Sequence, residues 1–102
     1  MDIRDELVRE AVSGDPQAFR EVYGALAPKV LGYLRARGVE DAEGLSSEVF
    51  LAVYPRLSGL TGGAAGLRTL VFSVAHARAV DDVRRRTRRP ATFSYEPEYD
   101  ER

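Results

Sequence analysis

The sequence predicts an all-α domain, a compact bundle of three main helices preceded by a short N-terminal helix. Two observations favour this class: apolar residues recur at spacings of three and four, and no stretch alternates apolar and polar residues over the length of a strand. A chain of 102 residues is long enough for one buried core and too short for two. We expect one domain over residues 1–90 and an acidic, irregular tail over 91–102.

The first two helices are predicted from their end residues and apolar stripes. A short helix over about residues 3–13 stops at Gly14. The second begins with Asp15 as a cap and Pro16 at the first helical position, where the missing N–H costs nothing. It ends at Gly38, and Pro28 inside it predicts a kink. Its apolar stripe consists of Phe19, Val22, Tyr23, Leu26, Val30, Leu31 and Leu34.

A third helix is predicted over about residues 41–57, with Asp41 as its cap and Glu43 in its first turn. Its core face consists of Ala42, Leu45, Val49, Ala52, Val53 and Leu57, and its opposite face of Gly44, Ser47, Glu48, Leu51 and Pro55. An apolar Leu51 beside the carboxylate of Glu48 indicates a partner surface. An ordinary solvent-exposed face with one exposed leucine remains the alternative.

The fourth helix is predicted over about residues 67–87, after a flexible, glycine-rich loop over residues 58–66. Its apolar residues lie on two sides, with Leu67, Leu70, Val71 and Val74 on one and Phe72, Ala75, Ala79 and Val83 on the other. A helix that is apolar on two sides is central to a bundle. Its last turns are basic, and Pro90 ends it.

Charge is distributed unevenly, although the net charge is only −1. Five arginines fall within residues 84–89, while the tail is acidic. Cations at a helix C-terminus complement the helix dipole, and Asp81 with Arg85 and Asp82 with Arg86 are favourable i, i+4 pairs. Those local effects use about two arginines. The remaining arginines are candidates for contact with nucleic acid, and an exposed basic surface is the alternative.

Several classes of function are excluded or disfavoured. The chain has no cysteine and a single histidine, His76, so disulfides and thiol nucleophiles are excluded, and we expect no metal and no cofactor. The glycine-rich loop lacks the Lys-Ser/Thr ending of a phosphate-binding P-loop, and no catalytic constellation is present, so we expect no enzymatic activity. With no apolar run of about 20 residues and no signal peptide, we expect a cytoplasmic protein that does not enter membranes.

Four stretches of the chain occur in the order and spacing of a known family. They are Gly14-Asp15-Pro16-Gln17-Ala18-Phe19 with Val22-Tyr23, then Ala27-Pro28-Lys29-Val30, then Asp41 through Leu51, then Leu67-Arg68-Thr69-Leu70 through Arg84. Together they resemble domain 2 of the extracytoplasmic-function sigma factors of the sigma-seventy family, and the resemblance covers about residues 5–90. It implies a sigma domain 2-like helical bundle.

The resemblance implies that the third helix grips the clamp helices of the largest RNA polymerase subunit. The matching positions are Gly44, Ser47 and Glu48, with Leu51 beside them. The family usually has Asp at the first of these positions and Gln at the second, so only Glu48 keeps the usual residue.

The resemblance also implies that the loop and the polar side of the fourth helix hold a base flipped out of the minus-ten promoter element. The candidate DNA-binding residues are Gly62, Gly63, Arg68, His76, Ala77, Arg78, Arg84, Arg85 and Arg88. A Trp that is usual near Leu70 is absent, His76 stands where Arg is common, and Ala77 stands where Asn is common. We expect the arginine run to lie beside the glycine segment, and about four phosphate contacts would give a log-log salt slope of about −3.

These expectations describe a non-enzymatic module of bacterial transcription initiation. Its partners would be the RNA polymerase core and the single-stranded minus-ten region of promoter DNA. The alternative is a sigma-like module used only for protein interaction, as the target of an anti-sigma factor. The departures at Gly44, Ser47, Leu70 and Ala77 favour that alternative.

Overall fold

The computed structural model describes residues 3–88, and all the regular secondary structure within them is helical. Its elements are α1 (Asp5–Val12), α2 (Pro16–Ala36), α3 (Ala42–Val53), a 3₁₀ helix η1 (Tyr54–Gly59) and α4 (Gly63–Arg88). The predicted all-α class, with three main helices and a short first one, is confirmed. The predicted tail over 91–102, the stop at Pro90 and Arg89 lie outside the described residues.

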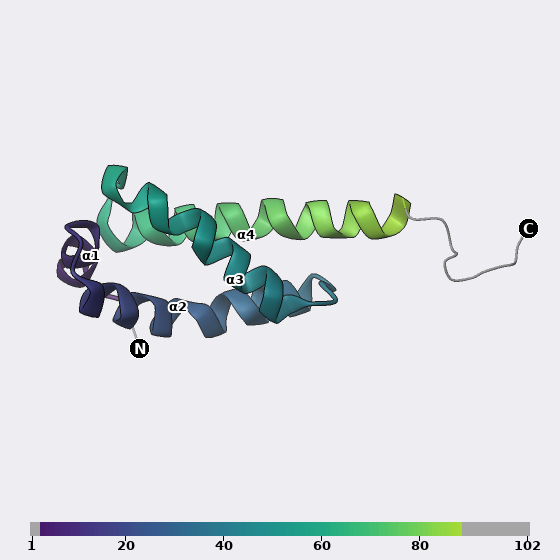
Figure 1. Cartoon of the computed structure of the whole chain (residues 1–102), viewed down its shortest axis with the longest axis horizontal. Coiled ribbons are helices and arrows are strands. Elements are labelled where there is room, and N and C mark those ends of the chain that lie inside the picture. The colour runs from purple at the N-terminus through teal and green to yellow at the C-terminus, as the bar shows by residue number, and fades with distance from the viewer. Residues whose placement is uncertain (1–2, 89–102) are drawn as a thin grey trace, which may run out of the picture.

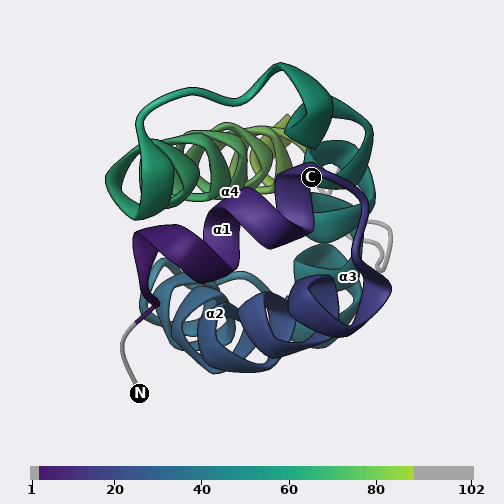
Figure 2. The same cartoon turned by 90° about the vertical axis from the view of Figure 1, so that its left-hand side faces the viewer.

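The helices form a bundle around one core. In Figure 1, α2 and α4 run side by side in the same direction, and α3 returns between them in the opposite direction. Figure 2, turned by 90°, shows α1 lying across the end of the bundle, between the starts of α2 and α4. The last turns of α4 extend past the end of α2 (Figure 1), so this part of α4 is exposed on more sides than the rest.

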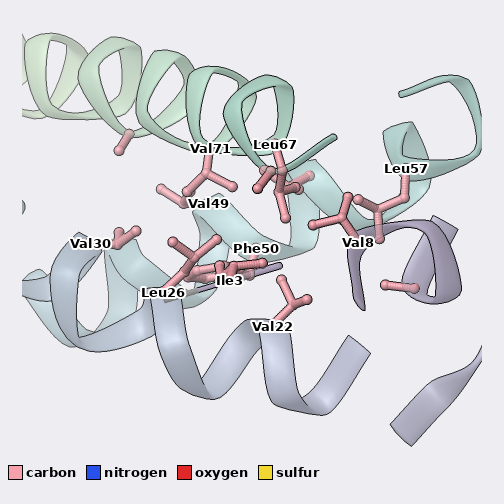
Figure 3. Packing of buried hydrophobic residues seen from close by; sticks show 14 of the residues in the cluster. Ile3, Val8, Val22, Leu26, Val30, Val49, Phe50, Leu57, Leu67 and Val71 are labelled. Carbon is pink, nitrogen blue, oxygen red and sulfur yellow. The ribbon is translucent and has the colours of Figure 1, made fainter. Parts of the chain in front are cut away.

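Every helix contributes apolar side chains to this core. Figure 3 shows Val8 from α1, Leu26 from α2, Val49 from α3 and Val71 from α4 pointing toward one another. The largest fully buried side chains are Leu26, Leu34, Leu67, Val8, Val30, Val49, Val53 and Val71. Burying a side chain of this size stabilises a fold by about 1.5–3 kcal/mol, so these residues account for much of the bundle's stability.

The predicted caps of α2 and α3 are confirmed. The carboxylate of Asp15 accepts the backbone N–H of Gln17 at 3.0 Å, and the carboxylate of Asp41 accepts that of Gly44 at 3.0 Å. Gly38 follows α2 with a φ of 80°, a conformation that favours glycine. The helix is continuous through Pro28.

The predicted end of the third helix at about residue 57 is wrong. The α-helix ends at Val53, and residues Tyr54–Gly59 form the 3₁₀ helix η1. Pro55 explains the change, because it has no N–H and its ring collides with the carbonyl four residues earlier. Leu57 is still buried as predicted, because η1 turns it toward the core.

The predicted loop over residues 58–66 is also wrong, since α4 begins at Gly63. A carboxylate from α1 explains this early start: Asp5 accepts the backbone N–H of Ala64 at 2.9 Å, and Ala64 is buried. The Asp5 side chain thus acts as an N-cap supplied from a distant part of the sequence. Gly66 meets the carbonyl oxygen of Thr61 so closely that no side chain fits there.

Helix α4 contacts α1, α2 and α3, as expected of a central helix. Ala75 and Ala79 are buried, but Val83, predicted on the same apolar side, is 37% exposed because it lies near the projecting end of α4. Within residues 3–88, no helix has the length and apolar character needed to cross a membrane.

Candidate nucleic-acid and partner surfaces

The outer face of α3 carries the residues predicted to bind polymerase. Ser47, Glu48 and Leu51 are exposed there, and Leu51 keeps 74% of its surface accessible. Gly44 is half-buried, and a Cβ atom at this position would collide with the carboxylate of Asp41. A side chain at this position would require the Asp41 carboxylate to shift.

An aromatic cleft adjoins this face. It is open to solvent and has a volume of about 500 Å³. Its lining residues come from α2, α3 and η1: Phe19, Tyr23, Ser47, Phe50, Leu51 and Tyr54. Tyr54 is 60% exposed and Tyr23 40% exposed. Two of the residues predicted on the partner face, Ser47 and Leu51, thus form one wall of an apolar cleft that the sequence analysis did not identify.

Contacts between aromatic rings fix the positions of the side chains that line the aromatic cleft. Phe19 meets Tyr54 edge to face with ring centroids 4.9 Å apart, and Tyr23 meets Phe50 in the same way at 4.7 Å. Such pairs contribute about 0.5–1.5 kcal/mol beyond their burial. A shallower hollow of about 410 Å³ continues the cleft between α2 and α3, past Gly24 and Pro28.

Glu48 and Arg78 connect the two sets of predicted site residues. Arg78, expected to bind DNA, donates to the carboxylate of Glu48, expected to bind polymerase, at 3.3 Å. The pair joins α4 to α3 at the surface, and an exposed pair of this kind contributes less than about 1 kcal/mol. Arg78 therefore lies on the α3 side of α4.

The predicted DNA-binding residues are spread along the whole of α4. Gly62 and Gly63 lie at its start, where they line a pocket of about 480 Å³ with Asp5, Arg9 and Ser13 of the α1 region. Arg68 follows one turn later and is half-buried.

The expectation that the arginine run lies beside the glycine segment is wrong. Gly63 begins α4 and Arg84 lies near its end, at opposite ends of the helix in Figure 1. The 21 residues between them correspond to about 32 Å of helix at 1.5 Å per residue. One flipped base cannot contact both.

Consecutive residues in the middle of α4 face different directions. His76 is turned toward α2, where its Nδ1 and the hydroxyl of Tyr33 are 3.0 Å apart. Arg78 is turned toward α3, and Ala77 between them is exposed on the outer side. Because positions i, i+7 and i+11 share one side of a helix, Arg84 and Arg88 continue the outer stripe that Ala77 begins.

The arginines at the end of α4 differ in their partners. Asp82 pairs with Arg86 at 3.0 Å, as predicted, and with Arg85 at 3.8 Å. The predicted pair of Asp81 with Arg85 is therefore wrong, because the half-buried Asp82 carboxylate attracts both arginines. Within residues 3–88, Arg84 and Arg88 are exposed and pair with no carboxylate.

Over the described part of the chain, no group of three or more His, Asp or Glu side chains is arranged to hold a metal ion. Comparison with known proteins adds no relative: no protein-family model matches the chain, and no curated protein and no solved structure matches it significantly. Residue chemistry and geometry alone therefore support the function proposed below.

Proposed function

We propose that this chain is a sigma domain 2-like module of bacterial transcription initiation. In this proposal the outer face of α3 and the aromatic cleft bind the clamp helices of RNA polymerase, and the outer side of α4 holds single-stranded promoter DNA. The chain acts without catalysis and in the cytoplasm.

One observation carries the proposal: the α3 face that the sequence marks as a partner surface also lines a preformed apolar cleft. Ser47 and Leu51 belong to both. A cleft of about 500 Å³ between helices suits an apolar side chain from a partner helix. Exposed tyrosines around one cleft, here Tyr23 and Tyr54, are typical of the residues that dominate binding energy.

The cation pattern of α4 supports the DNA-binding part. The helix carries six arginines and two aspartates, and its outermost arginines, Arg84 and Arg88, lie on one stripe. Guanidinium groups without carboxylate partners are suited to phosphates. A single strand of DNA would have to extend over about 32 Å to contact both Arg84 and the pocket at Gly63.

Leu51→Asp tests the clamp-binding part. We expect it to reduce the affinity for a purified clamp-helix fragment more than tenfold, because it places a charge in the cleft. Val83→Asp is the matched control, since it also replaces an exposed apolar residue by Asp but lies far from the cleft. Equal affinities of the two variants, measured by calorimetry, would refute this use of the cleft.

The alternative, a protein-interaction module bound by an anti-sigma factor, is favoured by one observation. The aromatic cleft is a concentrated apolar site, whereas the predicted DNA contacts are dispersed along α4. Binding of an anti-sigma factor without binding of either single-stranded DNA or the clamp fragment would support this alternative.

A further inference from the structure

The C-terminal ends of α2 and α4 meet at one end of the bundle. Tyr33 of α2 contacts His76 of α4, and further along Arg86 of α4 donates to the backbone carbonyl of Gly38 at 2.7 Å. The second contact involves later residues of both segments than the first, so α2 and α4 run parallel here, as Figure 1 shows. The end of α2 therefore lies beside the part of α4 between His76 and Arg86.

Arg37, the residue that follows the last turn of α2, is the cation that stands out in this region. Its guanidinium lies over the ring of Tyr33, with Cζ 4.9 Å from the ring centroid. The ring itself is fixed, because its hydroxyl contacts His76 at 3.0 Å and Phe72 packs edge-on against it at 5.7 Å. The Arg37 side chain is exposed and pairs with no carboxylate in residues 3–88.

From these contacts we infer that Arg37, stacked on Tyr33, is a platform on which an unpaired DNA base stacks. The inference rests on the proposed function and adds α2 residues to its DNA-binding surface. A guanidinium is planar and weakly hydrated, so it stacks on an aromatic ring with one face and on a base with the other. Because Tyr33 already holds it, binding a base immobilises few additional rotors.

The neighbouring residues complete a site for a short single strand. His76 is exposed beside the Tyr33 hydroxyl, and Arg84 lies two turns further along α4, about 12 Å away along its axis. Stacking surfaces next to guanidinium groups are the usual combination in single-strand binding sites. Base stacking supplies affinity here without selecting the sequence, because every base has a π face.

Arg35 provides a matched control for charge. It lies in the last turn of α2 two residues before Arg37, and it is exposed like Arg37. Its guanidinium is 3.7 Å from the carboxylate of Glu43, so it is turned toward α3. Arg35→Ala and Arg37→Ala remove the same charge from the same end of the same helix, but only the second removes the platform.

The experiment measures binding of a labelled single-stranded DNA of about 12 nucleotides to the full chain by fluorescence anisotropy. We expect Arg37→Ala to weaken binding about tenfold, Arg37→Lys nearly as much because lysine has no planar face, and Arg35→Ala less than about twofold. An oligonucleotide with abasic residues should bind the wild type and Arg37→Ala within about twofold of each other, because only the charge of Arg37 then contributes. Circular dichroism checks that each variant is folded.

The outcomes separate the two proposals. Wild-type affinity for Arg37→Lys, or equal losses for Arg37→Ala and Arg35→Ala, would overturn the stacking platform and leave the proposed function standing. A wild-type chain that binds no single-stranded DNA would overturn the DNA-binding part of the proposed function, and the platform with it.

Discussion

The start of α4 depends on a carboxylate from α1, and removing it should weaken the whole bundle. Asp5→Ala deletes the acceptor of the Ala64 N–H, a part-buried contact of 2.9 Å. Replacing a side chain that caps a helix costs about 1 kcal/mol, within a range of about 0.5–2. Asp5 also lies in the first turn of α1, where its charge stabilises that helix by a further 0.3–1 kcal/mol or so. We therefore expect a total loss of about 1–2 kcal/mol.

Glu6→Ala separates these two contributions. Glu6 also lies in the first turn of α1, and its only described partner is Arg4 at 3.6 Å, an exposed pair. Glu6→Ala removes a similar interaction with the dipole of α1 and leaves the contact between Asp5 and α4 in place. The difference between the two variants in the free energy of unfolding isolates the cap, at about 1 kcal/mol.

Urea unfolding followed by circular dichroism measures both free energies, and amide exchange at the start of α4 locates the effect. For a domain of this size, 1 kcal/mol corresponds to about 4–8 °C in melting temperature. If Asp5→Ala were no more destabilising than Glu6→Ala, the Asp5 carboxylate would not be what starts α4 at Gly63.

Two further predictions concern the glycines and the arginines. Gly66→Ala should destabilise the fold by about 1–3 kcal/mol in urea unfolding, because its Cβ would meet a backbone carbonyl, whereas Gly24→Ala, with open space around it, should stabilise by about 0.5–1 kcal/mol. A neutral Gly66→Ala would contradict the close approach at that turn. Arg84→Ala should weaken single-stranded DNA binding and lower the magnitude of the log-log salt slope by about 0.7, whereas Arg85→Ala, whose guanidinium pairs with a neighbouring carboxylate, should change the slope less. Identical slopes for both variants would remove the distinction between exposed and paired arginines.

Local sequence signals predicted the middle of the fold well. The Asp15 cap and Pro16 act within the first turn of α2, and the apolar stripe from Val22 to Leu34 follows from the helical repeat of that segment alone. Such short-range effects are visible in the sequence because the partners lie within a few residues. The same holds for the exposed Leu51 on the outer face of α3.

Long-range contacts account for most of what the sequence analysis missed. The start of α4 depends on Asp5, 59 positions away from Ala64, and no local pattern reveals that pairing. The aromatic cleft likewise forms only when Phe19 from α2 meets Tyr54 from η1. Helix propensity and periodicity describe single elements, and tertiary packing decides which of their surfaces meet.

Two errors could have been avoided from the sequence. Pro55 has no N–H to donate to the helix, which gives the change to a 3₁₀ helix after Val53 a local cause, although α2 continues through Pro28. A helix over residues 67–87 is about 30 Å long, so its two ends could not lie beside each other. Helix length alone therefore separates the glycine segment from the arginine run.

In the proposed function, α3 with the aromatic cleft binds the polymerase clamp, and the outer side of α4 is a separate surface that binds single-stranded DNA. The most direct measurement titrates a labelled oligonucleotide into the chain with and without a saturating clamp-helix fragment. We expect a ternary complex in which the DNA affinity is unchanged within about twofold, because Leu51 and Arg84 lie on different helices. Displacement of the DNA by the fragment, or failure of either to bind, would contradict it.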